Sequence, residues 1–198
     1  MCGRYVISDE EDEIVEILRK IDTNYSGEAT ATTGEIFPTN IAPILCIQNE
    51  QTSLRLMKWG FPKWDGKGVI INAKSETAAE KRMFSKPMKQ RRCVIPSTGF
   101  YEWTKGSKQK DKYQFNDPNT PMLYMAGLYS EYSNGKKPEH LTESFVILTR
   151  DANTYIEDIH DRMPVILRKD ELDSWLRDYD FATTITRRDN FELVRRAV

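Results

Sequence analysis

The sequence shows no long apolar run, no basic-then-apolar opening of the kind typical of a secretory signal, and no internal repeat. No apolar stretch approaches the roughly 20 residues that a membrane-spanning helix needs, and the acidic opening SDEEDEIVEIL is unlike a signal peptide. We therefore expect a cytoplasmic protein without membrane contacts. No linker rich in Pro, Gly or Ser divides the 198 residues, so the sequence predicts a single domain over residues 1–198.

Patterns typical of metal sites and disulfides are also missing. The three cysteines, Cys2, Cys46 and Cys93, are far apart and form no CxxC pair. The two histidines, His140 and His160, are not close to each other in sequence, and no HExxH motif is present. We expect no metal and no cofactor. Cys46 and Cys93 stand in apolar, strand-like runs and are interpreted as inert buried thiols, whereas Cys2 has no such setting.

The charge is nearly balanced overall but unevenly distributed. Residues 55–112 hold 15 Lys and Arg against 5 Asp and Glu, a net charge of +10, and the remainder carries −11. Such a segment forms either a solvated basic face or a surface that meets a polyanion, because clustered Lys and Arg attract phosphate.

Many short apolar segments separated by turn residues predict an α+β domain, with a curved or barrel-like mixed sheet and short helices outside it. APILCIQ and LRLMKWG, on either side of NEQTS, predict a hairpin. Helices are predicted at 9–21, at 75–84, at 151–160 and at about 169–179. Ser8 with Glu11 and Thr77 with Glu80 fit capping boxes for the first two.

Three polar residues in apolar surroundings are candidates for chemistry. Glu102 lies between Tyr101 and Trp103 and either faces solvent or is buried with a partner, where burial would raise its pKa. Asn72 follows a buried strand and either caps the next turn or reaches into a pocket. His160, beside Asp158, Asp161 and Arg162, is either structural or catalytic, while His140 is expected to be solvated.

These signals become specific in combination. The blocks MCGRY, PTNIAP, MKWGFPKW, INAKSETAAEKRMF, IPSTGFYEW and DIHDRMPVIL occur in this order from residue 2 to about residue 167. Together they resemble the SRAP (SOS response-associated peptidase) family. The resemblance implies the SRAP fold, a role in the DNA damage response, and removal of Met1, which makes Cys2 the amino terminus. Met1 is removed either by a thiol autopeptidase activity of the chain itself or by an aminopeptidase.

The resemblance also implies a covalent link between Cys2 and the ring-opened aldehyde of an abasic site in single-stranded DNA, a lyase-like chemistry. By matching motifs, Asn72, Glu102 and His160 are the active-site partners of Cys2. The family commonly has Arg two residues after the Asn, whereas this chain has Lys74. Lys74 keeps the charge but lacks the guanidinium fork, which puts phosphate geometry there in doubt.

An amino-terminal cysteine suits this reaction because it carries an amine and a thiol on one residue. The amine, with a pKa of about 8, condenses with an aldehyde to an imine. The thiol then closes on the imine carbon to give a thiazolidine. We expect Glu102 to assist ring opening and shuttle protons, His160 to protonate the departing oxygen, and Asn72 to hold the Cys2 main chain or the adduct.

The expected partner is single-stranded DNA with abasic sites, bound by a chain that we favour as a monomer. When bound to DNA, the protein is expected to be associated with the nucleoid if the source is bacterial. Trp64 and Phe84 either stack on bases or pack in the core, and Arg162 either contacts DNA or pairs with Asp158 or Asp161. The expected DNA contacts are Arg4, Asn40, Pro43, Trp64, Lys74, Arg82, Phe84 and Arg162. Two other functions stay open, a thiol peptidase acting on other proteins and a noncovalent reader of modified DNA.

Overall fold

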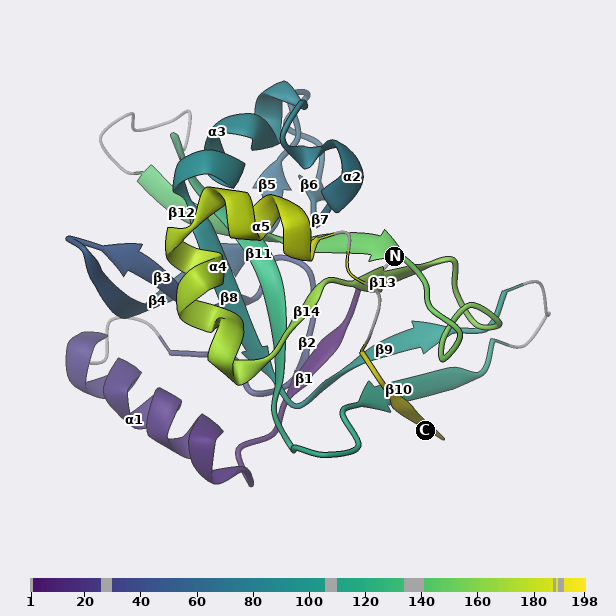
Figure 1. Cartoon of the computed structure of the whole chain (residues 1–198). Helices are drawn as coiled ribbons and strands as arrows, with labels where there is room; N and C mark the ends of the chain where they lie inside the picture. The colour runs from purple at the N-terminus through teal and green to yellow at the C-terminus, as the bar shows by residue number, and fades with distance from the viewer. Residues whose placement is uncertain (1, 26–29, 106–109, 134–140, 187, 189–190) are drawn as a thin grey trace.

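A computed structural model describes residues 2–25, 30–105, 110–133, 141–186, 188 and 191–198. The strands form an eight-stranded sheet, a five-stranded sheet and a two-stranded ribbon, and short helices lie outside them (Figure 1). The predicted α+β class with a barrel-like mixed sheet is confirmed. No helix in these ranges is long and apolar enough to cross a membrane.

The larger sheet contains β3 (Ile41–Gln48), β4 (Gln51–Trp59), β7 (Asn72–Lys74), β8 (Arg92–Ser97), β11 (Leu123–Ser133), β12 (Leu141–Asp151), β13 (Arg162–Pro164) and β14 (Ile166–Leu167). Strands β12, β4, β3, β8 and β11 close into a ring, because β11 also pairs with β12. Within the ring only the β4–β12 pairing is parallel, and β7 adds a second parallel partner to β12.

The predicted hairpin is confirmed as β3 and β4, with Gln48 opposite Gln51. The two connecting residues, Asn49 and Glu50, have φ angles of 49° and 62°. Positive φ at both central positions is the signature of a type I′ turn, whose twist matches that of the flanking strands.

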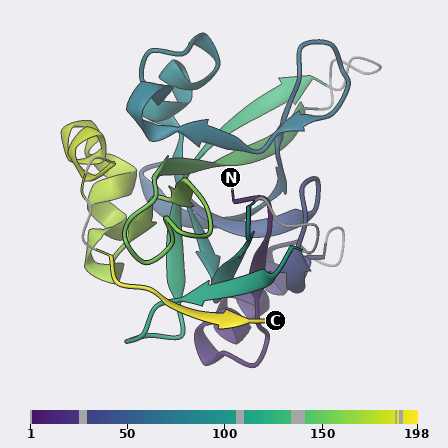
Figure 2. The same cartoon turned by 90° about the vertical axis from the view of Figure 1, so that its right-hand side faces the viewer.

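The smaller sheet has the order β15-β10-β9-β1-β2 and is antiparallel throughout. Its strands are β1 (Tyr5–Ile7), β2 (Gly34–Ile36), β9 (Gly99–Trp103), β10 (Lys112–Asn116) and β15 (Val194–Ala197). In Figure 2 the start of the chain lies near the middle of the molecule, and β15, in yellow, lies at its periphery beside β10. A separate ribbon pairs β5 (Phe61–Pro62) with β6 (Val69–Ile70).

The helices are α1 (Asp12–Tyr25), α2 (Ser75–Ala78), α3 (Arg82–Gln90), the 3-10 helix η1 (Lys169–Glu171), α4 (Leu172–Arg177) and α5 (Tyr179–Ile185). Helix α1 packs on β3 and β4, and α4 packs on β8. The predicted helix at 9–21 is present but begins three residues later. The hydroxyl of Ser8 accepts from the Glu10 amide at 3.4 Å, not from that of Glu11 as a capping box requires.

Two predicted helices are each divided into two. At 75–84 the chain breaks at Lys81, which is extended with ψ 125° and starts α3 as a separate helix. No side chain caps α2, so the predicted Thr77–Glu80 capping box is wrong. At 169–179 the helix ends at Arg177, because the Asp178 carboxylate accepts from the amides of Asp180 and Phe181 and thereby caps α5.

The helix predicted at 151–160 is wrong. Residues 154–159 form successive turns. Asn153 starts them, since its side-chain oxygen accepts from the Tyr155 amide at 3.2 Å and its side-chain amide donates to the Phe191 carbonyl at 2.8 Å. Asn is a typical turn initiator because its short side chain bonds the backbone nearby.

Candidate active site

Cys2 is fully buried just before β1. The Asn72 side-chain amide donates to the Cys2 carbonyl at 2.9 Å, and the Tyr101 amide donates to the Arg4 carbonyl at 2.9 Å. β1 pairs with β9 with Tyr5 opposite Phe100. These bonds fix the segment between the two sheets, beside the strand that carries Glu102. The position of Cys2 is therefore set by tertiary hydrogen bonds and not by a frayed chain end.

The Cys2 thiol is held in its neutral form. Burial raises its pKa well above the ordinary value, and the negative charge of Glu102 raises it further. Its sulfur lies 3.7 Å from the Arg4 carbonyl oxygen, to which the thiol donates a weak hydrogen bond.

Asn72 reaches toward Cys2 and does not cap the following turn. It is buried at the start of β7, where the pairing with β12 sets it opposite Ile147. Its side-chain oxygen is buried without a hydrogen-bond partner among the described residues. The Asn72 side chain therefore binds Cys2 through its NH2 group, and its side-chain oxygen is available as an acceptor.

Glu102 is buried, with only 4% of its surface exposed. On β9 it alternates with Tyr101 and Trp103 and so lies on the opposite face of the sheet. Burial raises the pKa of its carboxyl to about 7, although the positive amino terminus acts in the other direction. At neutral pH this carboxyl is thus populated in both its protonated and its ionised forms.

His160 ends the turn segment, and its amide donates to the Ile156 carbonyl at 2.9 Å. Burial lowers its pKa, so the imidazole is neutral at pH 7. Its Nδ1 accepts from the Arg162 amide at 2.9 Å but also lies 2.9 Å from a carboxylate oxygen of Asp161. One ring nitrogen cannot accept and donate at once. The neutral ring favours the backbone bond, which assigns the proton to Nε2.

Glu102 and His160 share their electrostatic surroundings. Asp161 and Lys105 shift the pKa of both groups. Because Glu102 also acts on Cys2, and Asn72 holds the Cys2 carbonyl, the four residues predicted as the active site form one neighbourhood.

Four ion pairs anchor the segment around His160. Asp158 binds Arg195 of β15 at 2.6 Å, and Asp161 binds Lys105 at 3.0 Å. Arg162 takes neither Asp158 nor Asp161 as its partner, so that predicted alternative is wrong. Its buried guanidinium instead binds both carboxylate oxygens of Glu76 at 2.8 and 2.9 Å, Asp151 at 2.5 Å and the Thr149 carbonyl at 2.7 Å.

The predicted DNA contacts divide by exposure. Trp64 is fully exposed in the connection between β5 and β6, which excludes the alternative of core packing. Lys74 and Arg82 are also exposed. Phe84 is half-buried, with its ring centroid 6.0 Å from that of Phe61, so it packs against the core.

Three further predicted contacts have structural partners. Arg4 binds Glu35 at 3.0 Å and lies over the ring of Phe37 at 4.1 Å, with its side chain 32% exposed. The Asn40 side-chain oxygen accepts from the Phe37 amide at 2.8 Å and closes a turn. Pro43 is buried within β3, so its side chain offers little surface to a ligand.

Sequence reasoning missed the residues that anchor the site, namely Glu76, Lys105 and Arg195. Glu76 lies inside the block INAKSET, so its position near Asn72 was a usable signal. The sequence contains no comparable signal for Arg195, because its partner Asp158 is 37 residues away and both side chains are partly exposed.

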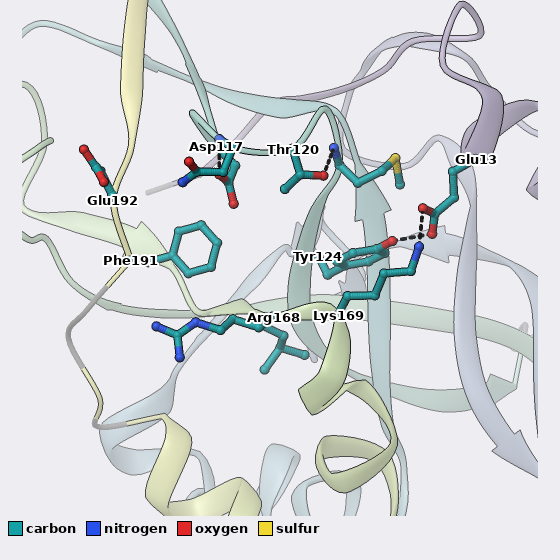
Figure 3. A pocket seen from close by; sticks show the side chains of 11 residues that line it. Glu13, Asp117, Thr120, Tyr124, Arg168, Lys169, Phe191 and Glu192 are labelled. Atoms are coloured by element: carbon teal, nitrogen blue, oxygen red, sulfur yellow. Dashed lines mark hydrogen bonds and ion pairs between the residues drawn. The ribbon is translucent and has the colours of Figure 1, made fainter.

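A cavity of about 470 Å³ lies elsewhere, between the start of α1, β11 and the segment before β15. Figure 3 shows Glu13, Tyr124 and Lys169 meeting on one side and Phe191 with Arg168 on the other. Lys169 binds Glu13 at 2.7 Å. None of the predicted site residues lines this cavity.

Cys46 and Cys93 face each other across β3 and β8 as buried free thiols, as predicted. Burial raises the pKa of Cys46 to about 11 and also raises that of Cys93 well above its ordinary value. In the described ranges no three His, Cys, Asp or Glu side chains cluster as metal ligands. His140 and Met1 lie outside the described residues.

Comparisons with known proteins agree on one family. The sequence pattern described as SOS response associated peptidase (SRAP) matches residues 1–193. Abasic site processing protein YoqW of Bacillus subtilis is 35% identical, over 89% of this chain and 80% of that protein. Abasic site processing protein YedK of Escherichia coli is 29% identical over the same shares. A solved structure from Bacteroides thetaiotaomicron superposes with a TM-score of 0.82 at 23% identity, over 100% of this chain and 92% of that one, which supports the fold.

Proposed function

Since the chain belongs to the SOS response associated peptidase (SRAP) family, we propose that it processes abasic sites in DNA by forming a covalent link through Cys2. The relatives named above are described as abasic site processing proteins. The proposed substrate is an abasic site in single-stranded DNA, and the proposed product is a thiazolidine between Cys2 and the sugar aldehyde.

The observation that carries the proposal is the bond from Asn72 to the Cys2 carbonyl at 2.9 Å, beside a buried Glu102. A residue at position two is ordinarily a mobile chain end. Here it is anchored next to a carboxyl whose pKa is raised to about 7 by burial. Such anchoring favours a reaction at the main-chain nitrogen of residue 2, because it fixes that nitrogen near a proton donor and acceptor.

The proposed sequence starts with hydrolysis of the Met1–Cys2 peptide bond, which consumes water and releases methionine. The freed Cys2 amine then attacks the aldehyde carbon, and the carbonyl oxygen takes a proton from Glu102. Loss of water gives the imine. The thiol sulfur adds to the imine carbon while its proton passes to the nitrogen through Glu102. The net reaction joins amine, thiol and aldehyde with release of one water.

The protonation states support this order of steps. Burial and Glu102 keep the thiol protonated, so the amine acts first as nucleophile and the thiol second. His160 is a neutral ring with its proton on Nε2, which suits donation of a hydrogen bond to the departing oxygen. This refines the expected role of His160, because a neutral imidazole donates a hydrogen bond more readily than it gives up a proton.

DNA binding is proposed to use exposed residues of the basic segment. Trp64 has the full exposure that stacking on an unpaired base requires, and Lys74 and Arg82 are exposed cations for phosphates. Arg4 lies two residues from Cys2 and keeps about a third of its side chain exposed. Phe84, Asn40, Pro43 and Arg162 have structural partners or burial that make them weaker candidates.

Intact-mass spectrometry with a single-stranded oligonucleotide carrying one abasic site tests the proposal. The parent protein is expected to lose Met1 and to gain the oligonucleotide mass minus one water, stably. Cys2→Ser, prepared with its Met1 already removed, is expected to give an adduct only after borohydride reduction, because a hydroxyl closes the ring poorly. Cys46→Ala serves as the control and is expected to react like the parent, since Cys46 is buried in β3.

Several outcomes contradict the proposal. Tight binding without an adduct in the parent, unchanged in Cys2→Ala, indicates a noncovalent reader of DNA. Turnover of added peptides that is lost in Cys2→Ala, with no DNA adduct in the parent, indicates a peptidase that acts on other proteins.

A further inference from the structure

The last strand reaches back to the segment that carries His160. β15 begins at Val194, one residue beyond the stretch matched by the family pattern, and all four of its residues are exposed. Two contacts nonetheless join residues 191–195 to the turns that precede His160. The buried Asn153 side chain donates to the Phe191 carbonyl at 2.8 Å. The Arg195 guanidinium binds both carboxylate oxygens of Asp158 at 2.6 and 2.7 Å.

The segment that makes these contacts is itself fixed to the domain. Leu193 is buried, and β15 pairs with β10 with Arg195 opposite Phe115. The Arg195 guanidinium lies 5.6 Å from the Tyr113 ring centroid. An arginine held by strand pairing and over an aromatic ring presents its guanidinium to Asp158 from a defined direction.

Asp158 lies inside the turn that sets His160. The amides of Ile159 and His160 both donate to the Ile156 carbonyl, at 2.8 and 2.9 Å. A restraint on Asp158 therefore restrains the backbone of this turn. On the other side, Lys105 holds Asp161 and Glu76 holds Arg162. Without Arg195, the turn segment would keep ion-pair anchors only after His160, as far as the described residues show.

We propose that residues 191–195 form a strap that fixes the His160 turn, and that Arg195 is a positioning residue for His160. This inference rests on the proposed function. The strap acts through Asp158 and Asn153 and touches neither DNA nor Cys2. Because the pair is partly exposed, with side-chain exposures of 41% and 55%, its loss is expected to change folding stability little. The effect is expected in the rate, where small misplacements of a reacting group matter.

The first test measures single-turnover crosslinking to an oligonucleotide with one abasic site. Arg195→Ala and Asp158→Asn are each expected to slow the reaction by about threefold or more, and the double variant by no more than the slower single one. The charge-swapped pair, Asp158→Arg with Arg195→Asp, is expected to recover the parent rate within about twofold. Arg196→Ala is the matched control, an exposed arginine on the same strand with no ion pair among the described residues, and is expected to react like the parent.

The second test does not depend on activity. The chain has only two histidines, so its NMR spectrum has two imidazole Hε1 signals, which a His140→Gln variant assigns. At pH 8, Arg195→Ala is expected to shift or broaden the His160 signal, and the charge-swapped pair to restore it. Arg196→Ala is expected to leave it in place.

The two tests separate the strap from the proposed function. If the parent forms no adduct, the proposed function fails, while the NMR comparison still reports on the strap. If the parent reacts but Arg195→Ala matches it in rate and in the His160 signal, the strap is wrong. Additive slowing in the double variant, or no rescue by the charge swap, also contradicts a positioning role.

Discussion

Two buried arginines connect segments in two regions of the molecule, and they differ in their hydrogen-bond partners. Arg92, on β8, bonds only backbone carbonyls, those of Met88 and Lys89 in α3 and of Trp175 and Leu176 in α4. Arg162, next to the candidate site, bonds the carboxylates of Glu76 and Asp151 and the Thr149 carbonyl.

The local electrostatics follow this difference. Burial lowers the pKa of Arg92, which forms no ion pair with a carboxylate among the described residues, and the negative charge of Asp178 offsets this only in part. Burial acts the same way on Arg162, but its bonds to Glu76 and Asp151 outweigh burial and raise its pKa. Arg92 satisfies the carbonyls left over at two helix ends, a purely structural task. Arg162 ties the segment after Asn72 to the segment after His160, so its loss is expected to reach the chemistry.

The largest effect is expected from Arg92→Ala, which leaves four bonds to buried carbonyls unmade. The free energy of unfolding is expected to fall by about 3 kcal/mol, as measured by urea denaturation. Crosslinking at low temperature, where the variant is folded, should stay within about twofold of the parent. Arg91→Ala is the control, because its pair with Glu131 is partly exposed. An Arg92→Ala variant as stable as the parent would contradict the structural role assigned to Arg92.

Glu102→Gln is expected to stabilise the fold while slowing crosslinking. The carboxyl has its pKa raised to about 7 in the folded state, so its contribution to stability is full below its unfolded pKa and is lost as the pH rises through about 7. The Glu102→Gln substitution should therefore leave the free energy of unfolding almost unchanged at pH 4 and raise it by about 2 kcal/mol at pH 8.

Urea denaturation at the two pH values measures this change in stability, with the exposed Glu10→Gln as control. A Glu102→Gln variant that crosslinks at the parent rate would take Glu102 out of the chemistry.

Arg162→Lys tests the functional half of the comparison. A single ammonium cannot span Glu76, Asp151 and the Thr149 carbonyl, so the rate at saturating DNA is expected to fall about tenfold. DNA affinity, measured by fluorescence anisotropy, is expected to change less than about twofold. Glu76→Gln, which leaves Arg162 intact, should lower the rate in the same direction. Weaker DNA binding with an unchanged rate would instead favour Arg162 as a DNA contact.

The smallest effect is expected at Lys74, an exposed neighbour of both Asn72 and Glu76. Lys74→Ala is expected to weaken binding of undamaged single-stranded DNA by about threefold at low salt, and less as salt rises, because one phosphate contact is lost. Lys74→Arg should bind at least as tightly as the parent. Unfolding free energy should not change in either variant. Unchanged affinity and unchanged salt dependence in Lys74→Ala would exclude Lys74 from the DNA-binding surface.

Sequence reasoning reached the fold class and the local hairpin but not the connections between distant segments. The β3–β4 hairpin follows from a turn of two residues between apolar runs, which is local information. The turn segment before His160 reads as a helix by periodicity, but it is organised by the Asn153 bond to Phe191, 38 residues away. β15 was missed because its four residues, VRRA, are all exposed and show no alternation of burial.

The candidate site shows the same division. From residue types alone, Glu102 is compatible with either a solvent-facing or a buried position. Asn72 is likewise compatible with capping the next turn or with reaching into a pocket. Only the family resemblance placed them with Cys2, since Asn72 and Cys2 meet across 70 positions of the chain. The structure resolves both alternatives, with Glu102 buried and Asn72 bonded to Cys2.

The closed ring of strands has a consequence for how the protein acquires activity during folding. Its parallel junction joins Lys58 of β4 to Ser144 of β12, and the same strand β12 receives β7, which carries Asn72. Pairing between segments so distant along the chain forms slowly, because a long loop must close before any contact offsets its entropy. The anchor for Cys2 is thus expected to form only when β12 has been synthesised and docked. A nascent chain that ends before β12 is therefore expected to contain Cys2 but to lack the strand pairing that holds Asn72 against it.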